Sequence, residues 1–160
     1  MVEMTNPLTA LISYQAAYKE GRIRPQACPS PSDLVVLMDK ETGPLRVSYA
    51  LIEHGVVKGI AIFIAGPHID QIPLFDIGYA VDENFRCQGV ATKVMEQSIS
   101  EMRAGFGRHI PRFYLQAVIG TTNVASQKVA ARIFGSSPKP ITDSVSGQPA
   151  LAYLRLIECR

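Results

Sequence analysis

Residues 76–92 read Asp-Ile-Gly-Tyr-Ala-Val-Asp-Glu-Asn-Phe-Arg-Cys-Gln-Gly-Val-Ala-Thr, and this stretch decides the predicted fold. The β-forming and aromatic residues from Pro73 to Val81 predict a strand, and the polar residues 82–88 predict a connection. From Gly89 to Met102, apolar residues recur on one face at the period of a helix. A strand, a turn and a helix in this order leave backbone N–H groups free at the positive end of the helix dipole.

The turn predicts an anion site, because its small residues let a ligand approach the backbone. Gly89 and Ala91 are small, Thr92 adds a hydroxyl in the first helical turn, and Arg86 adds a positive charge at the rim. The sequence contains neither a GxxxxGK[ST] loop nor a GxGxxG run, so the usual mononucleotide and dinucleotide sites are not indicated. From these residues alone, an unrelated α/β protein that binds a phosphate ester stays open.

The segments before the turn predict an antiparallel meander. From Leu45 the chain alternates in character. Val47, Tyr49 and Leu51 alternate with Arg46, Ser48 and Ala50, a pattern typical of a half-buried strand. His54-Gly55 turns the chain, and a second strand runs from Val56 to Ala65, where Gly66-Pro67 is expected to end it.

The segments after the turn predict a parallel neighbour for the strand that precedes it. Residues Phe113 to Ile119 are rich in β-forming types, and only a crossover joins this strand to the earlier one, so the two should be parallel. An amphipathic helix is predicted from Asn123 to Phe134, a mobile loop from Gly135 to Pro149, and a last strand from Ala150 to Ile157.

The N-terminal third predicts one helix followed by irregular chain. Asn6-Pro7 suits a helix start and the apolar spacing continues to about Tyr18, whereas residues 25–33 hold three prolines. Leu34 to Met38 fits either a short strand or a buried helical turn. We predict a single domain over residues 1–160, of α/β class (α+β type), with a mixed, mostly antiparallel sheet flanked by helices.

Composition restricts the classes of partner and site. The net charge is +2 and charged residues make up 19% of the chain, which argues against nucleic acid or an acidic membrane as partner. The three cysteines show no CxxC spacing, so neither a disulfide framework nor a metal site is expected. No run approaches the ~18 apolar residues of a membrane span and no signal peptide is recognisable, so we expect a cytoplasmic protein.

Two motifs resemble those of the GNAT superfamily of acyl-CoA-dependent N-acetyltransferases. The family pattern Gln/Arg-x-x-Gly-x-Gly/Ala is matched by Arg86, Gly89 and Ala91, between the predicted strand and helix. The later Asn123-x-x-Ser126 spacing is similar to that of the branch that acetylates ribosomal-protein N-termini. The resemblance covers residues 45–157. It implies the acyl-CoA N-acyltransferase fold, in which the two parallel strands splay apart, with acetyl-CoA (coenzyme A) as the acyl-donor cosubstrate.

Carried over by position, the resemblance also implies the cofactor contacts. Backbone groups of Tyr79, Ala80 and Val81 would bind the pantetheine arm, and Asn123 and Ser126 would lie beside the thiol. The diphosphate would lie over the turn and the first helical residues, namely Arg86, Cys87, Gln88, Gly89, Val90, Ala91 and Thr92.

For the proton transfers, the resemblance suggests Asp76 as the catalytic base, with Glu83 as a weaker alternative. The other interpretation is that Asp76 is a solvent-facing strand residue. Many members of the family take the acid from a Tyr seven residues after the Asn, but here that position is Ala130. Ser126 or a water would have to serve, and Tyr153 is a further candidate.

The predicted activity is transfer of an acetyl group directly to a primary amine, either a protein N-terminus or the amine of a small molecule. Covalent catalysis by Cys87 is disfavoured, because no His is near it in the sequence and the family transfers the acyl group directly. Because Ala130 replaces the usual Tyr, a non-catalytic acyl-CoA-binding or regulatory module is the alternative. Whether the chain forms a homodimer stays open.

Overall fold

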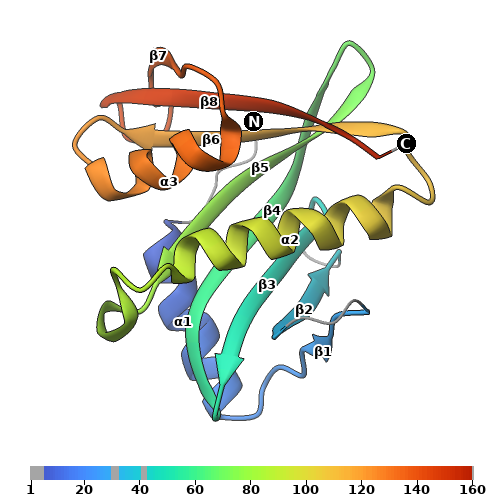
Figure 1. The fold of residues 1–160 in the computed structure, drawn as a ribbon, viewed down its shortest axis with the longest axis vertical. Helices are drawn as coiled ribbons and strands as arrows, with labels where there is room; N and C mark the ends of the chain where they lie inside the picture. The colour runs from blue at the N-terminus through green and yellow to red at the C-terminus, as the bar shows by residue number, and fades with distance from the viewer. Residues whose placement is uncertain (1–5, 30–32, 41–42, 160) are drawn as a thin grey trace.

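The computed structural model describes residues 6–29, 33–40 and 43–159, and its centre is one eight-stranded sheet. The strand order is β1-β2-β3-β4-β5-β6-β8-β7. The strands are β1 Gln26–Ala27, β2 Leu34–Asp39, β3 Arg46–Glu53, β4 Val56–Ile69, β5 Ile72–Val81, β6 Arg112–Gly120, β7 Lys139–Thr142 and β8 Pro149–Glu158. The helices are α1 Pro7–Lys19, the short 3₁₀ helix η1 Glu83–Phe85, α2 Val90–Phe106 and α3 Val124–Phe134 (Figure 1).

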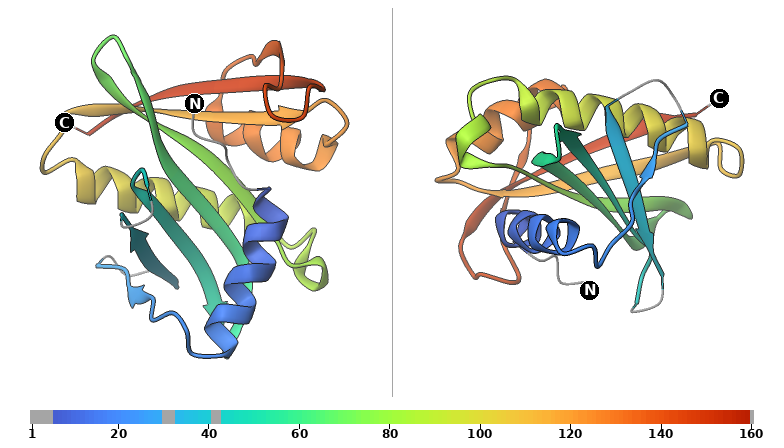
Figure 2. Two further views of the ribbon diagram at one scale, coloured as in Figure 1. Left: turned by 180° about the vertical axis from the view of Figure 1, so that it is seen from behind. Right: turned by 90° about the horizontal axis from the view of Figure 1, so that it is seen from below.

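The strand directions in the sheet agree with the predicted fold class. Every neighbouring pair in the sheet is antiparallel except β5 and β6, which are parallel and are joined by the crossover through α2. Helix α1 lies on one face of the sheet, and α2 and α3 lie on the other (Figure 2). The mixed, mostly antiparallel sheet with one parallel pair, flanked by helices, is therefore confirmed.

The core has two parts, one on each face of the sheet. Under α2 and α3 lies a large cluster that includes Phe63, Met95 and Phe113. Under α1 lies a smaller cluster that includes Leu11 and Ile62. The prediction that the strand now seen as β3 is half-buried was wrong, because these two clusters cover both of its faces.

Two predicted boundaries also differ from the structure. β4 does not end at Gly66-Pro67 but continues to Ile69, and its register against β5 shifts between Gly66 and Ile69. An irregularity of this kind accommodates a proline that has no N–H to donate to the ladder. The predicted mobile loop of residues 135–149 contains β7, which pairs with β8 and gives the sheet its last strand.

The N-terminal predictions are mostly confirmed. The side-chain oxygen of Asn6 accepts hydrogen bonds from the N–H groups of Leu8 and Thr9, at 2.9 and 3.5 Å, as a helix N-cap should. Residues 34–38 belong to strand β2, and within residues 25–33 the chain forms the short strand β1. Residues 30–32 of that stretch lie outside the described part of the chain. Among the described residues, no helix is long and apolar enough to cross a membrane.

Candidate active site

A gap opens in the sheet where the parallel strands β5 and β6 part. Their pairing runs through Leu74 with Tyr114 and Phe75 with Leu115, and ends where Asp76 meets Gln116. β5 continues to Val81 and β6 to Gly120 without further pairing between them. Figure 1 shows the two strands diverging toward the side where α2 and α3 begin.

The edge of β5 that faces this gap carries backbone groups that no neighbouring strand pairs. The Asp82 N–H donates to the Lys58 carbonyl at 2.9 Å, on the β4 side. Because backbone groups alternate in direction along a strand, the groups of Val81 and Tyr79 point to the other side, toward β6. The Val81 carbonyl accepts a hydrogen bond there from Arg86 Nε at 3.3 Å. Ala80 lies between these two residues, paired with Ile60 of β4.

Helix α2 begins without a side-chain cap. Its N-cap residue is Gly89, which has a φ of 77°, and no side chain accepts from the first turn. Helices α1 and α3, by contrast, begin at Asn6 and Asn123, whose side chains accept from backbone N–H groups. The first backbone bond inside α2 is from the Lys93 N–H to the Gly89 carbonyl at 3.0 Å. The N–H groups before Lys93 are therefore available to an anion.

The turn that leads to α2 has a defined shape. Asp82 caps η1 by accepting from the Asn84 N–H at 2.9 Å, and this N–H and the Gln15 side chain lower the pKa of Asp82. Cys87 is exposed and has a φ of 61°, so the chain passes through the left-handed region there and again at Gly89. Two left-handed residues let the backbone reverse between strand and helix within a few residues.

A contact from α1 fixes the start of this turn, and the sequence did not indicate it. Gln15 Nε2 donates to Asp82 Oδ2 at 2.8 Å and to the Val57 carbonyl at 3.1 Å. Gln15 and Asp82 are 67 residues apart in the sequence. No local pattern marks Gln15, because a Gln on a helix is ordinarily a solvent-facing residue.

The Asp76 carboxyl lies at the point where β5 and β6 separate. It is half-buried, and this burial raises its pKa above the ordinary value of a carboxyl. Oδ2 lies so close to Gly66 of β4 that a β-carbon added there would be 3.0 Å from it. Asp76 is therefore not the fully solvent-facing residue of the alternative interpretation, and the absence of a side chain at Gly66 leaves room for its carboxylate.

Asp76 and Ser126 flank the gap from opposite faces. Asp76 shares its face of β5 with Ala80, which packs against the cluster under α1. Ser126 is half-buried in the first turn of α3, on the other face. The Asn123 side chain accepts from the Ser126 N–H at 3.2 Å, so Asn123 serves as the helix cap.

Tyr79 adds a contact that sequence reasoning missed. Its hydroxyl donates to the backbone carbonyl of Ser126 at 2.6 Å, from β5 to α3. The other tyrosine considered, Tyr153, is only 3% exposed and packs against Phe134 with ring centroids 5.7 Å apart. Ala130, at the position where a Tyr is usual, is completely buried.

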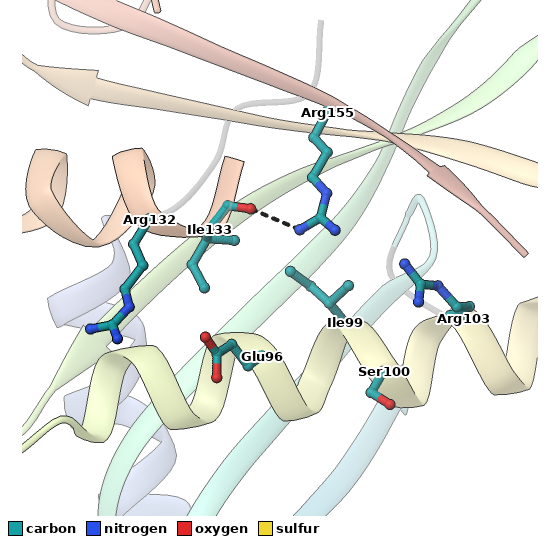
Figure 3. Close-up of a pocket in the computed structure, with 7 residues that line it drawn as sticks. All are labelled: Glu96, Ile99, Ser100, Arg103, Arg132, Ile133 and Arg155. Atoms are coloured by element: carbon teal, nitrogen blue, oxygen red, sulfur yellow. Dashed lines mark hydrogen bonds between the residues drawn. The ribbon is translucent and has the colours of Figure 1, made fainter. Parts of the chain in front are cut away.

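Two hollows on the surface lie away from the gap. One, of about 270 Å³, lies between α2, α3 and β8 and is lined by Arg103, Arg132 and Arg155, among others (Figure 3). Arg155 donates a hydrogen bond to the Ile133 carbonyl at 2.7 Å. The other, of about 400 Å³, lies under α1. Neither is lined by a residue predicted for the site. Among the residues that the structure describes, no group of three His, Cys, Asp or Glu side chains could hold a metal ion.

Solved structures with the same fold are acetyltransferases. An acetyltransferase of the GNAT family from Streptococcus pneumoniae matches 70% of this chain with a TM-score of 0.54 at 14% identity. A ribosomal L7/L12 α-N-protein acetyltransferase in complex with coenzyme A matches 72% with a TM-score of 0.53 at 21% identity. An acetyltransferase from Salmonella typhimurium that modifies the N-terminal serine of ribosomal protein L7/L12 matches 71% with a TM-score of 0.51 at 25% identity.

The alignments cover 66%, 64% and 64% of those three chains, so this chain spans just under two thirds of the length of each. A comparison with curated protein sequences found no match. The sequence model of the Acetyltransferase (GNAT) family, however, matches residues 15–135, a range that includes the gap, the turn and α3. The chain therefore belongs to the GNAT acetyltransferase family.

Proposed function

We propose that the protein is an N-acetyltransferase that moves an acetyl group from acetyl-CoA directly to a primary amine. The observation that carries the proposal is the end of the parallel pairing at Asp76 and Gln116, with the uncapped start of α2 at one side of the resulting gap. A gap with unpaired strand edges suits an extended chain with amide groups, and an uncapped helix start suits a diphosphate. Family membership supports this reading of both features.

The chain's own residues fit coenzyme A in three places. The diphosphate would bind the N–H groups of residues 89–92, with the Arg86 guanidinium beside the end of β5. The pantetheine arm would pair with the outward backbone groups of Tyr79 and Val81. Asn123 and Ser126 would lie at the thiol end, where α3 begins.

Asp76 and Ser126 would handle the protons. When bound, acetyl-CoA supplies the thioester whose acetyl group is transferred. Asp76 is a better base than an ordinary carboxylate, because burial raises its pKa toward that of an amine, and its Oδ atoms would take a proton from the acceptor. The Ser126 Oγ–H, on the opposite face, would donate a proton to the leaving sulfur.

A protein N-terminus is the acceptor class that we favour. The Salmonella acetyltransferase, at 25% identity, modifies an N-terminal serine. The Asn123-x-x-Ser126 spacing resembles the same branch, and the α1 face by Asp76 would receive the acceptor. The amine of a small molecule is the other acceptor class.

Titration calorimetry with acetyl-CoA and with ADP, followed by a thiol-release assay, tests the proposal. We expect acetyl-CoA to bind at micromolar concentration and ADP to bind far more weakly. With acetyl-CoA present, peptides with a free N-terminus should release thiol, and the same peptides with a blocked N-terminus should not. Binding without release from any amine would identify a non-catalytic acyl-CoA-binding module instead.

A pair of substitutions at Gly89 tests the diphosphate site. Gly89→Glu places an anion beside the free N–H groups, and we expect it to weaken acetyl-CoA binding by more than tenfold. Gly89→Gln has nearly the same size and the same strain at a φ of 77°, but no charge. Calorimetry should therefore give a much smaller loss for Gln than for Glu. Equal affinities for the two variants would rule out a diphosphate at this helix start.

A further inference from the structure

The Tyr79 hydroxyl bridges the gap on the face that carries α3. Tyr79 lies on β5 three residues beyond the last pair with β6, and Ser126 lies in the first turn of the helix that follows β6. The two residues are 47 positions apart in the sequence and are joined by a 2.6 Å hydrogen bond that is partly buried. Past Asp76, where backbone pairing has ended, this bond ties β5 to the chain on the other side of the gap.

Ser126 is held by both of its backbone groups. Its N–H donates to the Asn123 side chain at 3.2 Å, and its carbonyl accepts from Tyr79. A residue fixed at its N–H and at its carbonyl has a fixed Cα–Cβ direction, so its Oγ atom is confined to the three staggered positions about that bond. Removal of the Tyr79 hydroxyl would release one of these two restraints and leave the other in place.

We propose that Tyr79 is a positioning residue, whose hydroxyl sets the width of the gap and the place of the Ser126 side chain. The proposal rests on the proposed function, since it assigns to Tyr79 the task of holding the wall against which the thiol end of coenzyme A would lie. Tyr79 itself transfers no proton. Its backbone groups would bind the pantetheine arm, and its hydroxyl holds the first turn of α3.

Burial suits the Tyr79 hydroxyl to a holding role. Burial and the nearby Tyr153 raise the pKa of Tyr79, and the hydrogen bonds from the Ser126 side chain and the Ala130 backbone only partly offset this. A phenol with a raised pKa keeps its proton at every pH at which the enzyme would work, so it remains a hydrogen-bond donor.

The substitution Tyr79→Phe removes the hydroxyl and keeps the ring. We expect the affinity for acetyl-CoA to fall roughly three- to tenfold, in line with the loss of one hydrogen bond at the site. The kcat should fall by a similar factor, with an unchanged pH profile. In the ligand-free protein, amide hydrogen exchange in residues 124–130 should accelerate, because the first turn of α3 has lost its tie to β5.

Tyr49→Phe is the control, because Tyr49 is a buried tyrosine that lies on β3, two strands from β5. It should leave both acetyl-CoA affinity and exchange in residues 124–130 at wild-type values. Wild-type affinity and exchange in Tyr79→Phe would overturn the proposal. So would unchanged affinity with a more than hundredfold fall in kcat and a lost alkaline limb, which would make Tyr79 a proton donor.

The failure of the proposed function can be told apart from the failure of this inference. The exchange measurement needs no ligand, so it reports on the tie between β5 and α3 even in a chain that transfers nothing. Absence of acetyl-CoA binding in the wild-type protein would end the proposed function, whereas exchange unaffected by Tyr79→Phe would end the positioning role.

Discussion

At the scale of single residues, the position of Asp76 combines two properties that a base needs. Its carboxyl is half-buried, which raises its pKa, and it lies at the end of the β5–β6 pairing, next to the opening where reactants would meet. Gly66 contributes by having no side chain, since a β-carbon there would crowd the carboxylate at 3.0 Å.

Asp76→Asn tests the base. The wild-type kcat should rise with pH through the raised pKa of Asp76, because only the ionised carboxylate accepts a proton. In the variant this acid limb should disappear, with kcat lower by ~10²-fold or more and acetyl-CoA affinity nearly unchanged. Glu83→Gln removes an exposed carboxylate of the adjoining turn. A loss of turnover in Glu83→Gln but not in Asp76→Asn would make Glu83 the base.

The same substitution has a signature in stability. Because the folded-state pKa of Asp76 is raised, its contribution favours folding below the unfolded-state pKa and is lost as pH rises through the folded-state pKa. The wild-type Tm should therefore fall relative to that of Asp76→Asn between acidic and neutral pH. Parallel Tm curves for the two proteins would mean that the carboxyl is solvated as in the unfolded chain.

Which residues of the site could be predicted from the sequence depends on how local their signals are. Gly89 and Ala91 were predicted from small residues close together where a strand gives way to a helix, whereas Asn123 was predicted only from the resemblance to the GNAT family. The bonds from Tyr79 to Ser126 and from Gln15 to Asp82 join residues 47 and 67 positions apart. Neither has a sequence spacing that predicts it, because such pairs exist only once the strands and helices have been assembled.

At the scale of elements, the start of α2 depends on its close approach to β4. A β-carbon at Gly59 would be 2.9 Å from Val90 Cγ1 and 3.3 Å from the Ala80 carbonyl oxygen. Val90 is the first residue of α2 and carries one of the N–H groups proposed for the diphosphate. Gly59 therefore lets the helix settle on the sheet at the depth at which the turn forms.

Gly59→Ala should destabilise the protein by about 1–3 kcal/mol through overpacking. For a domain of this size, each kcal/mol corresponds to roughly 2–4 °C in Tm. Acetyl-CoA affinity should also fall, because Val90 would have to move. The matched control is Gly105→Ala, in the exposed part of α2 where an added β-carbon meets nothing within 4 Å. It should raise stability by about 0.5–1 kcal/mol, and a fall in its Tm would contradict this reading.

The predicted elements agree with the structure where the sequence period is clear. The helices, the hairpin at His54-Gly55 and the strand before the turn were recognisable from local pattern. The burial of β3 on both faces was not recognisable. Alternation of residues indicates that one face of a strand is buried, and the second face of β3 is covered by α1. β7 has four residues and exists only through its pairing with β8, so a composition rich in turn formers concealed it.

At the scale of the whole molecule, the rules of chirality and connectivity predicted most of the strand directions in the sheet. A strand, a crossover helix and another strand in sequence order predicted the one parallel pair, and the meander before it predicted the antiparallel remainder. The place where the parallel pair separates cannot be obtained in this way. It entered the sequence analysis only through the resemblance to the GNAT family.

The separation of β5 and β6 also has a consequence for solubility. It leaves two strand edges in the interior of an eight-stranded sheet, and unpaired edges are templates for the backbone of another chain. With pantetheine in the gap, these edges would be covered by the cosubstrate. The protein with bound ligand should then self-associate less readily than the ligand-free protein.

Light scattering on gentle heating tests this, with coenzyme A at the concentration that raises Tm as much as Gly105→Ala does. Both should slow aggregation by stabilising the fold, but coenzyme A should slow it more, since only the ligand covers the edges. Equal slowing would mean that stability alone governs association. Greater slowing would mean that the uncovered strand edges take part in association.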